Sequence, residues 1–196
     1  MKTKENDRRV QRTRRTLREA LIALILEKGY DQVTVQHIID RADVGRSTFY
    51  AHFENKDKLL LSGFKNVREM LLEANPAHQK KQKQAGDFLF NSLKIFQHAD
   101  ENRRIYGALA GRSGGDLFLK QMFRELYDIC LAEIQSSVSK KDKDSVLTKA
   151  AAHFFASSLI SLLTFWLDNN LPLTPEQIDE IFKQFTMPGI KSVCEF

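Results

Sequence analysis

Residues 34–53 read T-V-Q-H-I-I-D-R-A-D-V-G-R-S-T-F-Y-A-H-F, and the structure of the N-terminal third can be inferred from them. Its first half carries apolar residues at helical spacing, and its second half places Phe49 and Phe53 four positions apart. Between the halves, Asp43-Val44-Gly45 interrupts the pattern. We therefore predict two short helices that meet at a tight turn and pack their apolar side chains on a preceding helix, from about residue 9 to residue 28.

The outer face of the second short helix is left with basic and hydroxylic side chains. They are Arg46, Ser47, Thr48, Tyr50 and His52. A short helix with such a face fits the major groove of DNA, where Arg pairs with guanine and Thr offers a hydroxyl and a methyl group. Tyr50 and His52 are long enough to reach backbone phosphates. The alternative is an ordinary solvated helix surface, and for Phe49 and Phe53 we expect a place in the core.

Positive charge is concentrated at the start of the chain. Residues 1–18 hold eight Lys and Arg residues against two acidic ones, a net charge of +6, whereas the whole chain carries +5. A basic arm beside a folded module suits phosphate contact, because neutralised phosphates release counterions. The alternative is a solvated and frayed N-terminus.

The composition indicates a soluble globular protein. Hydrophobic residues make up 42% of the 196 residues and charged residues 28%. The richest apolar stretch, residues 154–167, is interrupted by serines and is too short to span a membrane. The N-terminus lacks a secretion signal, so we expect a cytoplasmic protein. Cys130 and Cys194 match no metal or redox spacing, and we expect both to be reduced and structural.

Helical periodicity continues through the rest of the chain, so the predicted fold class is all-α. Asn55 is a candidate cap for a fourth helix that begins at about Lys56. Residues 75–86 read as a linker. Further helices are expected at about 87–99, 101–110, 117–138 and 146–169, and a last one from Thr174-Pro175 to about Phe185.

The N-terminal residues resemble the TetR family of bacterial transcriptional regulators. The resemblance covers about residues 12–62, and its specific part is T-F-Y-x-H-F followed by N-K-D at residues 48–57. The matching positions are Gly29-Tyr30, Val33-Thr34-Val35, Ile38-Ile39, Ala42, Val44, Arg46 to Tyr50, His52-Phe53, Asn55-Lys56-Asp57, Leu59 and Leu60. The end of the chain is similar to a common variant of the family, with Trp166 and then L-P-L-T-P-E-Q-I from Leu171.

The resemblance implies a three-helix DNA-binding head and a helical ligand-binding body. By position, Thr34, Tyr50, His52 and Lys56 are expected to contact phosphates, and Arg46, Ser47 and Thr48 to face the groove. Two residues depart from the family pattern. Asp43 stands where Gly is frequent, and Asp tolerates a left-handed backbone. Gly45 stands where Ser often caps the recognition helix, and it lacks the hydroxyl.

The body is rich in aromatic residues, and the resemblance implies a ligand pocket there. Our candidates for the pocket wall are Phe96, Tyr106, Met122, Phe123, Tyr127 and Phe155. The alternative for each is a place in the ordinary core. His98 and His153 form no recognised metal site, and we expect neither a metal nor a cofactor. No phosphate loop or catalytic motif is found, so an enzyme is not expected.

These expectations combine into one interpretation. Residues 1–55 would form the helix-turn-helix DNA-binding domain, and residues 56–196 the ligand-binding and dimerisation domain. The last two long helices, residues 150–169 and 176–185, would form a four-helix interface in a homodimer. The interpretation predicts a sequence-specific regulator, a repressor released from its operator by a small-molecule effector. An activator stays open, and so does a helical protein-binding or DNA-coating module without sequence preference.

Overall fold

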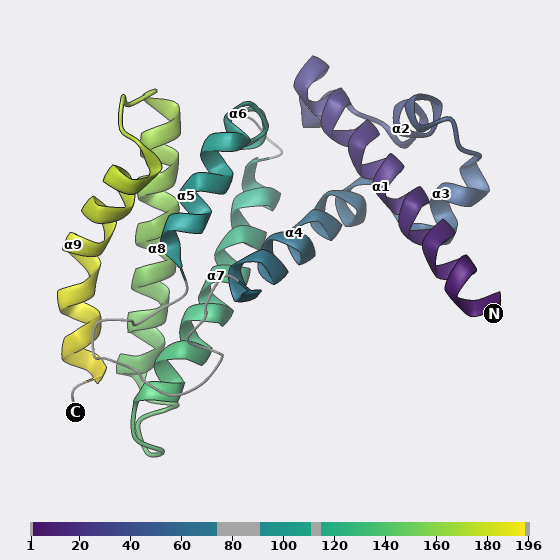
Figure 1. Cartoon of the computed structure of the whole chain (residues 1–196). Helices are drawn as coiled ribbons and strands as arrows, with labels where there is room; N and C mark the ends of the chain where they lie inside the picture. The colour runs from purple at the N-terminus through teal and green to yellow at the C-terminus, as the bar shows by residue number, and fades with distance from the viewer. Residues whose placement is uncertain (1, 74–90, 111–114, 195–196) are drawn as a thin grey trace. The chain divides into compact units, whose positions relative to one another are not determined.

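The computed structural model describes residues 2–73, 91–110 and 115–194, and within these ranges the chain is helical and contains no strand. Helix makes up 84% of the structure, which confirms the predicted all-α class. The predicted linker at residues 75–86 lies outside the described residues. In chain order the elements are α1 (Lys2–Lys28), η1 (Tyr30–Gln32), α2 (Val35–Ala42), α3 (Arg46–His52), α4 (Lys56–Glu73), α5 (Ser92–Glu101), α6 (Arg103–Ala110), α7 (Gly115–Ser137), α8 (Val146–Asp168) and α9 (Pro175–Cys194) (Figure 1).

The helices group into two compact units. The first comprises Met1–Asn66 with Arg104–Phe118, and the second comprises Val67–Arg103 with Leu119–Phe196. The chain passes from the first unit to the second inside α4, so this one continuous helix belongs to both.

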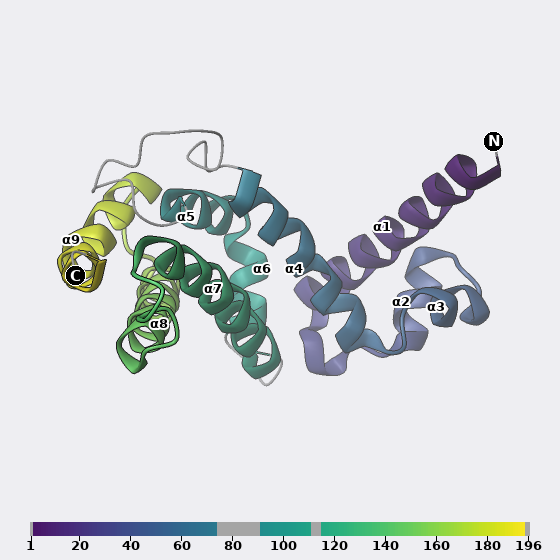
Figure 2. The same ribbon diagram turned by 90° about the horizontal axis from the view of Figure 1, so that it is seen from below.

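In the first unit, α1 packs along α2, and the short α3 follows α2 across the turn (Figure 2). The core of this head is apolar and closely packed. Leu17, Leu21, Ile38, Phe49 and Leu59 are each at most 1% exposed. Burial of such large side chains stabilises a domain by about 2 kcal/mol each, so α1, α2, α3 and the start of α4 form one cooperative body. The helix α1 begins at Lys2, seven residues before the expected start.

In the second unit, α5, α8 and α9 lie side by side around an aromatic core (Figures 1 and 2). Phe96 of α5 packs edge-on against Trp166 of α8, with the ring centroids 5.9 Å apart. Phe182 of α9 contacts Phe96 and also Phe155, at 6.1 and 4.8 Å. The indole N–H of Trp166 donates to the carbonyl of Leu173 at 3.1 Å, which ties the end of α8 to the loop before α9.

Two features of α8 and α9 differ from the sequence expectations. By length and composition alone, α8 is long and apolar enough to cross a membrane, whereas the sequence analysis expects no membrane-spanning segment. Its buried residues, among them Leu159, Leu163 and Trp166, lie in the core of the second unit, as in many soluble proteins. The helix α9 continues to Cys194 through Pro188, well beyond the expected end near Phe185. This extension buries Ile190, which is 2% exposed.

Candidate nucleic-acid interface and effector groove

The turn between α2 and α3 is built by local backbone geometry. Asp43 adopts the left-handed conformation, with φ 51° and ψ 51°, and its amide donates to the carbonyl of Asp40. The amide of Val44 donates to the carbonyl of Ile39 at 3.1 Å. Asp is one of the few non-glycine residues that adopt this conformation readily, so the expected tight turn is present with Asp in the usual position of Gly.

A capping box fixes the start of α2. The Thr34 hydroxyl accepts a hydrogen bond from the His37 amide at 3.2 Å, and the Thr34 amide donates to Nδ1 of His37 at the same distance. The Lys28 ammonium also donates to Nδ1 of His37, at 2.9 Å. The His37 side chain therefore holds the N-terminus of α2 against the end of α1.

The outer face of α3 is open to solvent. Arg46, Ser47 and Tyr50 are exposed, Thr48 and His52 are half-buried, and Phe49 beneath them is fully buried. The Tyr50 ring packs edge-on against Phe49 at 5.4 Å, and about half of its side chain is exposed. The Arg46 guanidinium donates to the side-chain oxygen of Gln36 at 3.0 Å, a partner that the sequence did not suggest. Small and large polar side chains thus stand on a rigid helical base.

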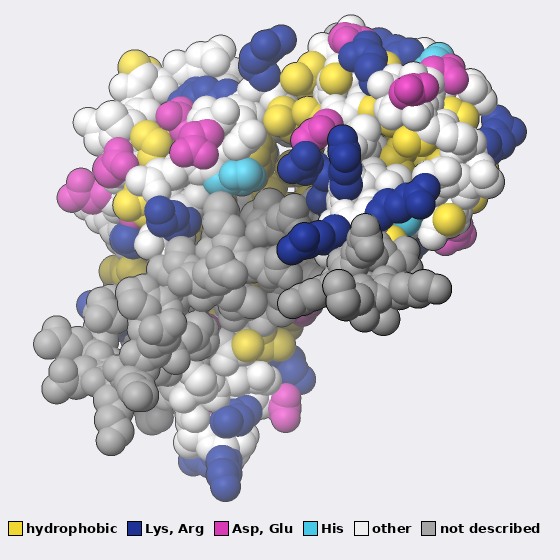
Figure 3. Space-filling model, turned by 45° about the vertical axis from the view of Figure 1, so that its right-hand side comes forward, with side chains coloured by type: hydrophobic (Ala, Val, Ile, Leu, Met, Phe, Trp, Pro, Cys, Tyr) yellow, Lys and Arg dark blue, Asp and Glu magenta, His cyan; other side chains and the backbone are white. Residues whose placement is uncertain are grey.

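Positive charge is concentrated on α1, which reaches the end of α3 at Arg14. Arg8, Arg9, Arg12, Arg14 and Arg15 are exposed on α1, and Figure 3 shows Lys and Arg side chains standing out from the N-terminal unit. The Arg14 guanidinium lies over the Phe53 ring, 5.4 Å from its centroid, so this cation is held next to the end of α3. The head therefore presents a set of exposed cations, which suits a polyanion.

Lys56 differs from the other predicted DNA contacts. Its side chain is half-buried, and its ammonium donates to the carbonyls of Tyr30 and Val33 at 3.0 and 2.8 Å. The structure therefore directs this amine toward the segment between α1 and α2.

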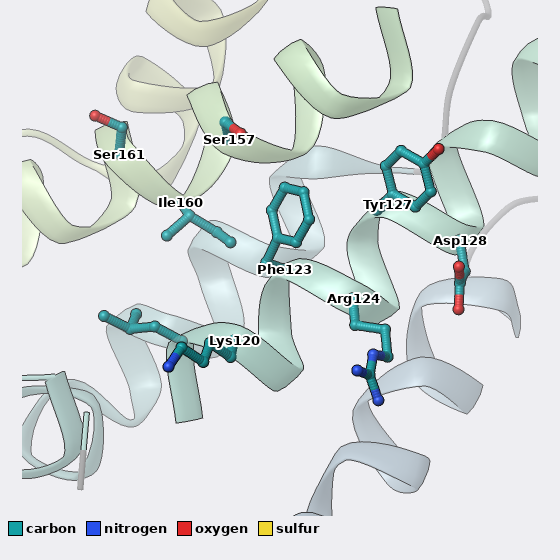
Figure 4. Close-up of a pocket in the computed structure, with 9 residues that line it drawn as sticks. Lys120, Phe123, Arg124, Tyr127, Asp128, Ser157, Ile160 and Ser161 are labelled. Atoms are coloured by element: carbon teal, nitrogen blue, oxygen red, sulfur yellow. The ribbon is translucent and has the colours of Figure 1, made fainter. Parts of the chain in front are cut away.

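A second candidate site lies within the second unit, in an open groove of about 830 Å³ between α7 and α8 (Figure 4). Phe123 and Tyr127 of α7 stack at 5.9 Å, and His153 of α8 packs edge-on against Phe123 at 5.0 Å. Figure 4 shows Phe123 reaching from α7 toward Ile160 and Ser157 of α8. The lining residues are Leu119, Lys120, Phe123, Arg124, Tyr127, Asp128, Ser157, Ile160 and Ser161.

The six predicted pocket residues do not come together. Phe123 and Tyr127 line the groove, whereas Phe96 and Phe155 belong to the aromatic core of α5, α8 and α9. Met122 is buried on α7. Tyr106 packs against Phe118 in the first unit, with the ring centroids 5.5 Å apart. Burial raises the pKa of Tyr106 to about 12. The sequence did not predict the lining residues of α8, which include Ser157 and Ser161, because serine is not typical of a ligand pocket.

A third surface feature is an apolar stripe on α8, formed by Leu147, Phe154 and Phe165, each more than half exposed. Positions 147, 154 and 165 share one helical face, because separations of seven and eleven residues return to nearly the same side. Phe185 of α9 is 74% exposed. A row of exposed large apolar side chains on one helical face is typical of an interaction surface. In the described part of the chain, no three His, Cys, Asp or Glu side chains are close enough to hold a metal ion.

Comparisons with known proteins agree with this arrangement. A family model described as "Bacterial regulatory proteins, tetR family" matches residues 17–62, and one described as "Transcriptional regulator C-terminal region" matches residues 88–188. The HTH-type transcriptional regulator YxbF of Bacillus subtilis is 29% identical over 189 residues, which are 94% of this chain and 47% of YxbF. The chain therefore spans about half the length of this relative.

Solved structures of other proteins share the fold. A TetR-family transcriptional regulator from Syntrophomonas wolfei superposes with a TM-score of 0.73 at 21% identity, over 92% of this chain and 95% of that chain. NalD, the secondary repressor of the MexAB-OprM multidrug efflux pump in Pseudomonas aeruginosa, gives a TM-score of 0.64 at 20% identity, over 92% of this chain and 96% of that chain.

Proposed function

Because the chain belongs to the TetR family of bacterial transcriptional regulators, we propose that it is a sequence-specific repressor that acts as a homodimer and leaves its operator when a small molecule binds. The observation that carries the proposal is the outer face of α3. Exposed Arg46, Ser47 and Tyr50 stand on a helix whose other side, Phe49, is fully buried. A helix with one anchored and one polar face enters a major groove as a rigid unit.

Within this proposal the side chains of the head have different tasks. Arg46, Ser47 and Thr48 read base edges, with Arg46 favouring guanine. Tyr50 and His52, together with Thr34, contact phosphates and set the register. Residues 1–55 form the DNA-binding domain, and residues 56–196 the ligand-binding and dimerisation domain. The function needs no cofactor and no catalytic group, and it places the protein in the cytoplasm with the DNA.

The homodimer is supported by the apolar stripe of α8 and by Phe185 of α9. Two copies that pair these surfaces about a twofold axis bury both sets of aromatic side chains in a four-helix interface. DNA geometry also favours a dimer, because two recognition helices that read adjacent half-sites must lie about 34 Å apart.

The groove between α7 and α8 is the candidate effector site. The Phe123 and Tyr127 rings and Ile160 provide an apolar wall, and Ser157 and Ser161 provide hydroxyls. Such a lining suits a flat or apolar molecule. An effector that favours one spacing of the two heads shifts the population of the dimer toward it. Since α4 connects head and body, its tilt would remove the recognition helices from successive grooves.

The repressor role follows the example of NalD, a repressor with the same fold. The test is a selection of duplexes from a random DNA pool, followed by affinity measurements at physiological salt. The proposal expects an inverted-repeat site bound at least a thousandfold more tightly than unrelated DNA. Equal affinity for all duplexes would instead identify a DNA-coating module. Transcription from the selected site then separates repression from activation.

A further inference from the structure

The ammonium of Lys56 is engaged by the protein on several sides. It donates to the carbonyls of Val33 at 2.8 Å, Tyr30 at 3.0 Å and Asp31 at 3.4 Å. It also lies over the ring of Tyr30, 4.4 Å from the centroid. A lysine has three N–H donors, so these contacts account for all of them. The acceptors belong to η1 and its end, where the Tyr30 carbonyl also accepts from the Val33 amide at 3.1 Å. A one-turn helix satisfies few of its own carbonyls, so its last turn accepts a side-chain donor readily.

Asp57, the residue after Lys56, contacts the same turn through Tyr30. The hydroxyl of Tyr30 donates to the carboxylate of Asp57, and burial together with this carboxylate raises the pKa of Tyr30 above its ordinary value. The phenol therefore stays a donor over the whole physiological range. Lys56 and Asp57 are the first two residues of α4, and together they grip the backbone, the ring and the hydroxyl of Tyr30.

The segment that they grip joins two helices of the head. Gly29, with φ 77°, directly follows the last residue of α1. At the other end of the segment, Val33 precedes Thr34, which caps α2. A displacement of the start of α4 therefore pulls on the end of α1 and the beginning of α2 together.

Resting on the proposed DNA-binding function, we propose that Lys56 is a positioning residue that locks the start of α4 to the turn between α1 and α2, and not a phosphate contact. A phosphate oxygen could reach the ammonium only by replacing carbonyls that it already binds. These contacts of Lys56 and Asp57 with residues 30–33, here called the lock, make the head and the first turn of α4 one rigid body. The direction of α4 then sets the position of α3.

The salt dependence of DNA binding tests this assignment. Each phosphate contact adds about 0.9 to the slope of log K against log salt concentration. We expect Lys56→Met to lower operator affinity on the order of tenfold, by loss of charge-assisted hydrogen bonds, with the slope unchanged. Lys56→Arg should fail to restore affinity, because a planar guanidinium does not fit a compact set of three carbonyls.

Three further variants serve as controls. Lys58→Met removes the same charge two residues along α4, at an exposed amine that makes no hydrogen bond or ion pair within the described residues, and it reports the effect of net charge alone. Tyr30→Phe removes the bond to Asp57 without a change in charge. It should lower affinity in the same way, and its effect should not add to that of Lys56→Met. Ile25→Val weakens the core of the head without touching the lock, and it should leave the affinity of the folded protein unchanged.

The results that would contradict this assignment differ from those that would contradict the proposed function. If Lys56→Met lowers the slope by about one and Lys56→Arg restores both slope and affinity, then Lys56 contacts a phosphate and the inference is wrong, while the proposed function stands. If the wild-type protein shows no operator preference at all, the proposed function itself fails.

Discussion

The guanidinium of Arg46, the first residue of α3, donates a hydrogen bond to the side-chain oxygen of Gln36 on α2, 3.0 Å away. The amide nitrogen of Gln36 in turn donates to Asp40 at 2.7 Å. The side chain expected to read guanine is thus oriented by the first helix of the motif. An ordered Arg has less conformational entropy to lose when it meets a base.

From this relationship we expect Arg46→Ala and Tyr50→Ala to differ in kind. Arg46→Ala should relax the preference for guanine at one operator position, at a cost of about 1 to 3 kcal/mol for the preferred base. Tyr50→Ala should lower the affinity for every duplex by about the same factor, whatever its sequence. Affinities for the operator and for single-base variants measure both effects. Identical profiles for the two variants would contradict the division between base reading and phosphate contact.

The N-cap of α3 offers a stabilising substitution. Gly45 has an extended backbone, with φ −70°, and a Cβ atom there would meet Ser47 and Thr48 at ordinary contact distances of 3.8 and 3.9 Å. We expect Gly45→Ser to raise the free energy of unfolding by about 0.5 kcal/mol, because its hydroxyl can accept from an amide of the first turn. Urea denaturation measures the change. Gly45→Ala has the same Cβ without the hydroxyl, and equal stability of the two variants would exclude a capping effect.

The apolar stripe of α8 predicts the oligomeric state. The double variant Phe154→Glu with Phe165→Glu should weaken self-association on the order of a thousandfold or more, because each copy loses two buried aromatic contacts and gains two buried charges. Sedimentation analysis measures the dissociation constant. Lys94→Glu, which reverses a charge at an exposed position of α5, should leave it unchanged. A double variant that still sediments as wild type would remove the stripe from the interface.

The buried Tyr106 predicts a loss of stability at alkaline pH. Its pKa is raised to about 12, whereas an unfolded tyrosine ionises near 10, so the folded state keeps the proton longer. This contribution is complete below pH 10 and is lost as the pH rises toward 12. Between pH 8 and pH 11, the wild type should lose about 1.4 kcal/mol more than Tyr106→Phe does. Tyr127→Phe removes the same hydroxyl from the open groove and serves as the matched variant. A Tyr106→Phe protein that loses as much stability as the wild type would contradict the prediction.

The groove between α7 and α8 can be probed with 8-anilinonaphthalene-1-sulfonate, an aromatic anion that fluoresces in apolar surroundings. We expect Ser157→Trp to fill the space beside Phe123 and to reduce the affinity for the probe at least tenfold. Ser136→Trp places the same side chain at an exposed position near the end of α7 and should have no effect. Equal binding to both variants would place the probe elsewhere.

Much of the head could be predicted from residues 34–57. The spacing of Ile38, Ile39, Phe49 and Phe53 specifies which sides of two short helices are apolar, and all four residues are buried. The position of Asp43 predicts the left-handed turn, which the backbone adopts. These features are local, because helix periodicity and turn chemistry depend on neighbours in the chain.

The partners of long polar side chains were not predictable in the same way. Lys56 has the position of a phosphate contact, yet its ammonium binds carbonyls 23 to 26 residues earlier in the chain. Likewise, aromatic residues in the body share one composition signal, but only Phe123 and Tyr127 of the six candidates line the groove. Periodicity indicates that a side chain faces inward, and it does not say which helix lies opposite.

The spacing of residues along the sequence was therefore sufficient to identify the helices, the turn and the polar outer face of α3. Which carbonyls surround the amine of Lys56, and which rings border an open groove instead of the core, was decided by the packing of distant helices. The physical reason is that a long side chain has several staggered arrangements of similar energy, and only its folded surroundings select one of them.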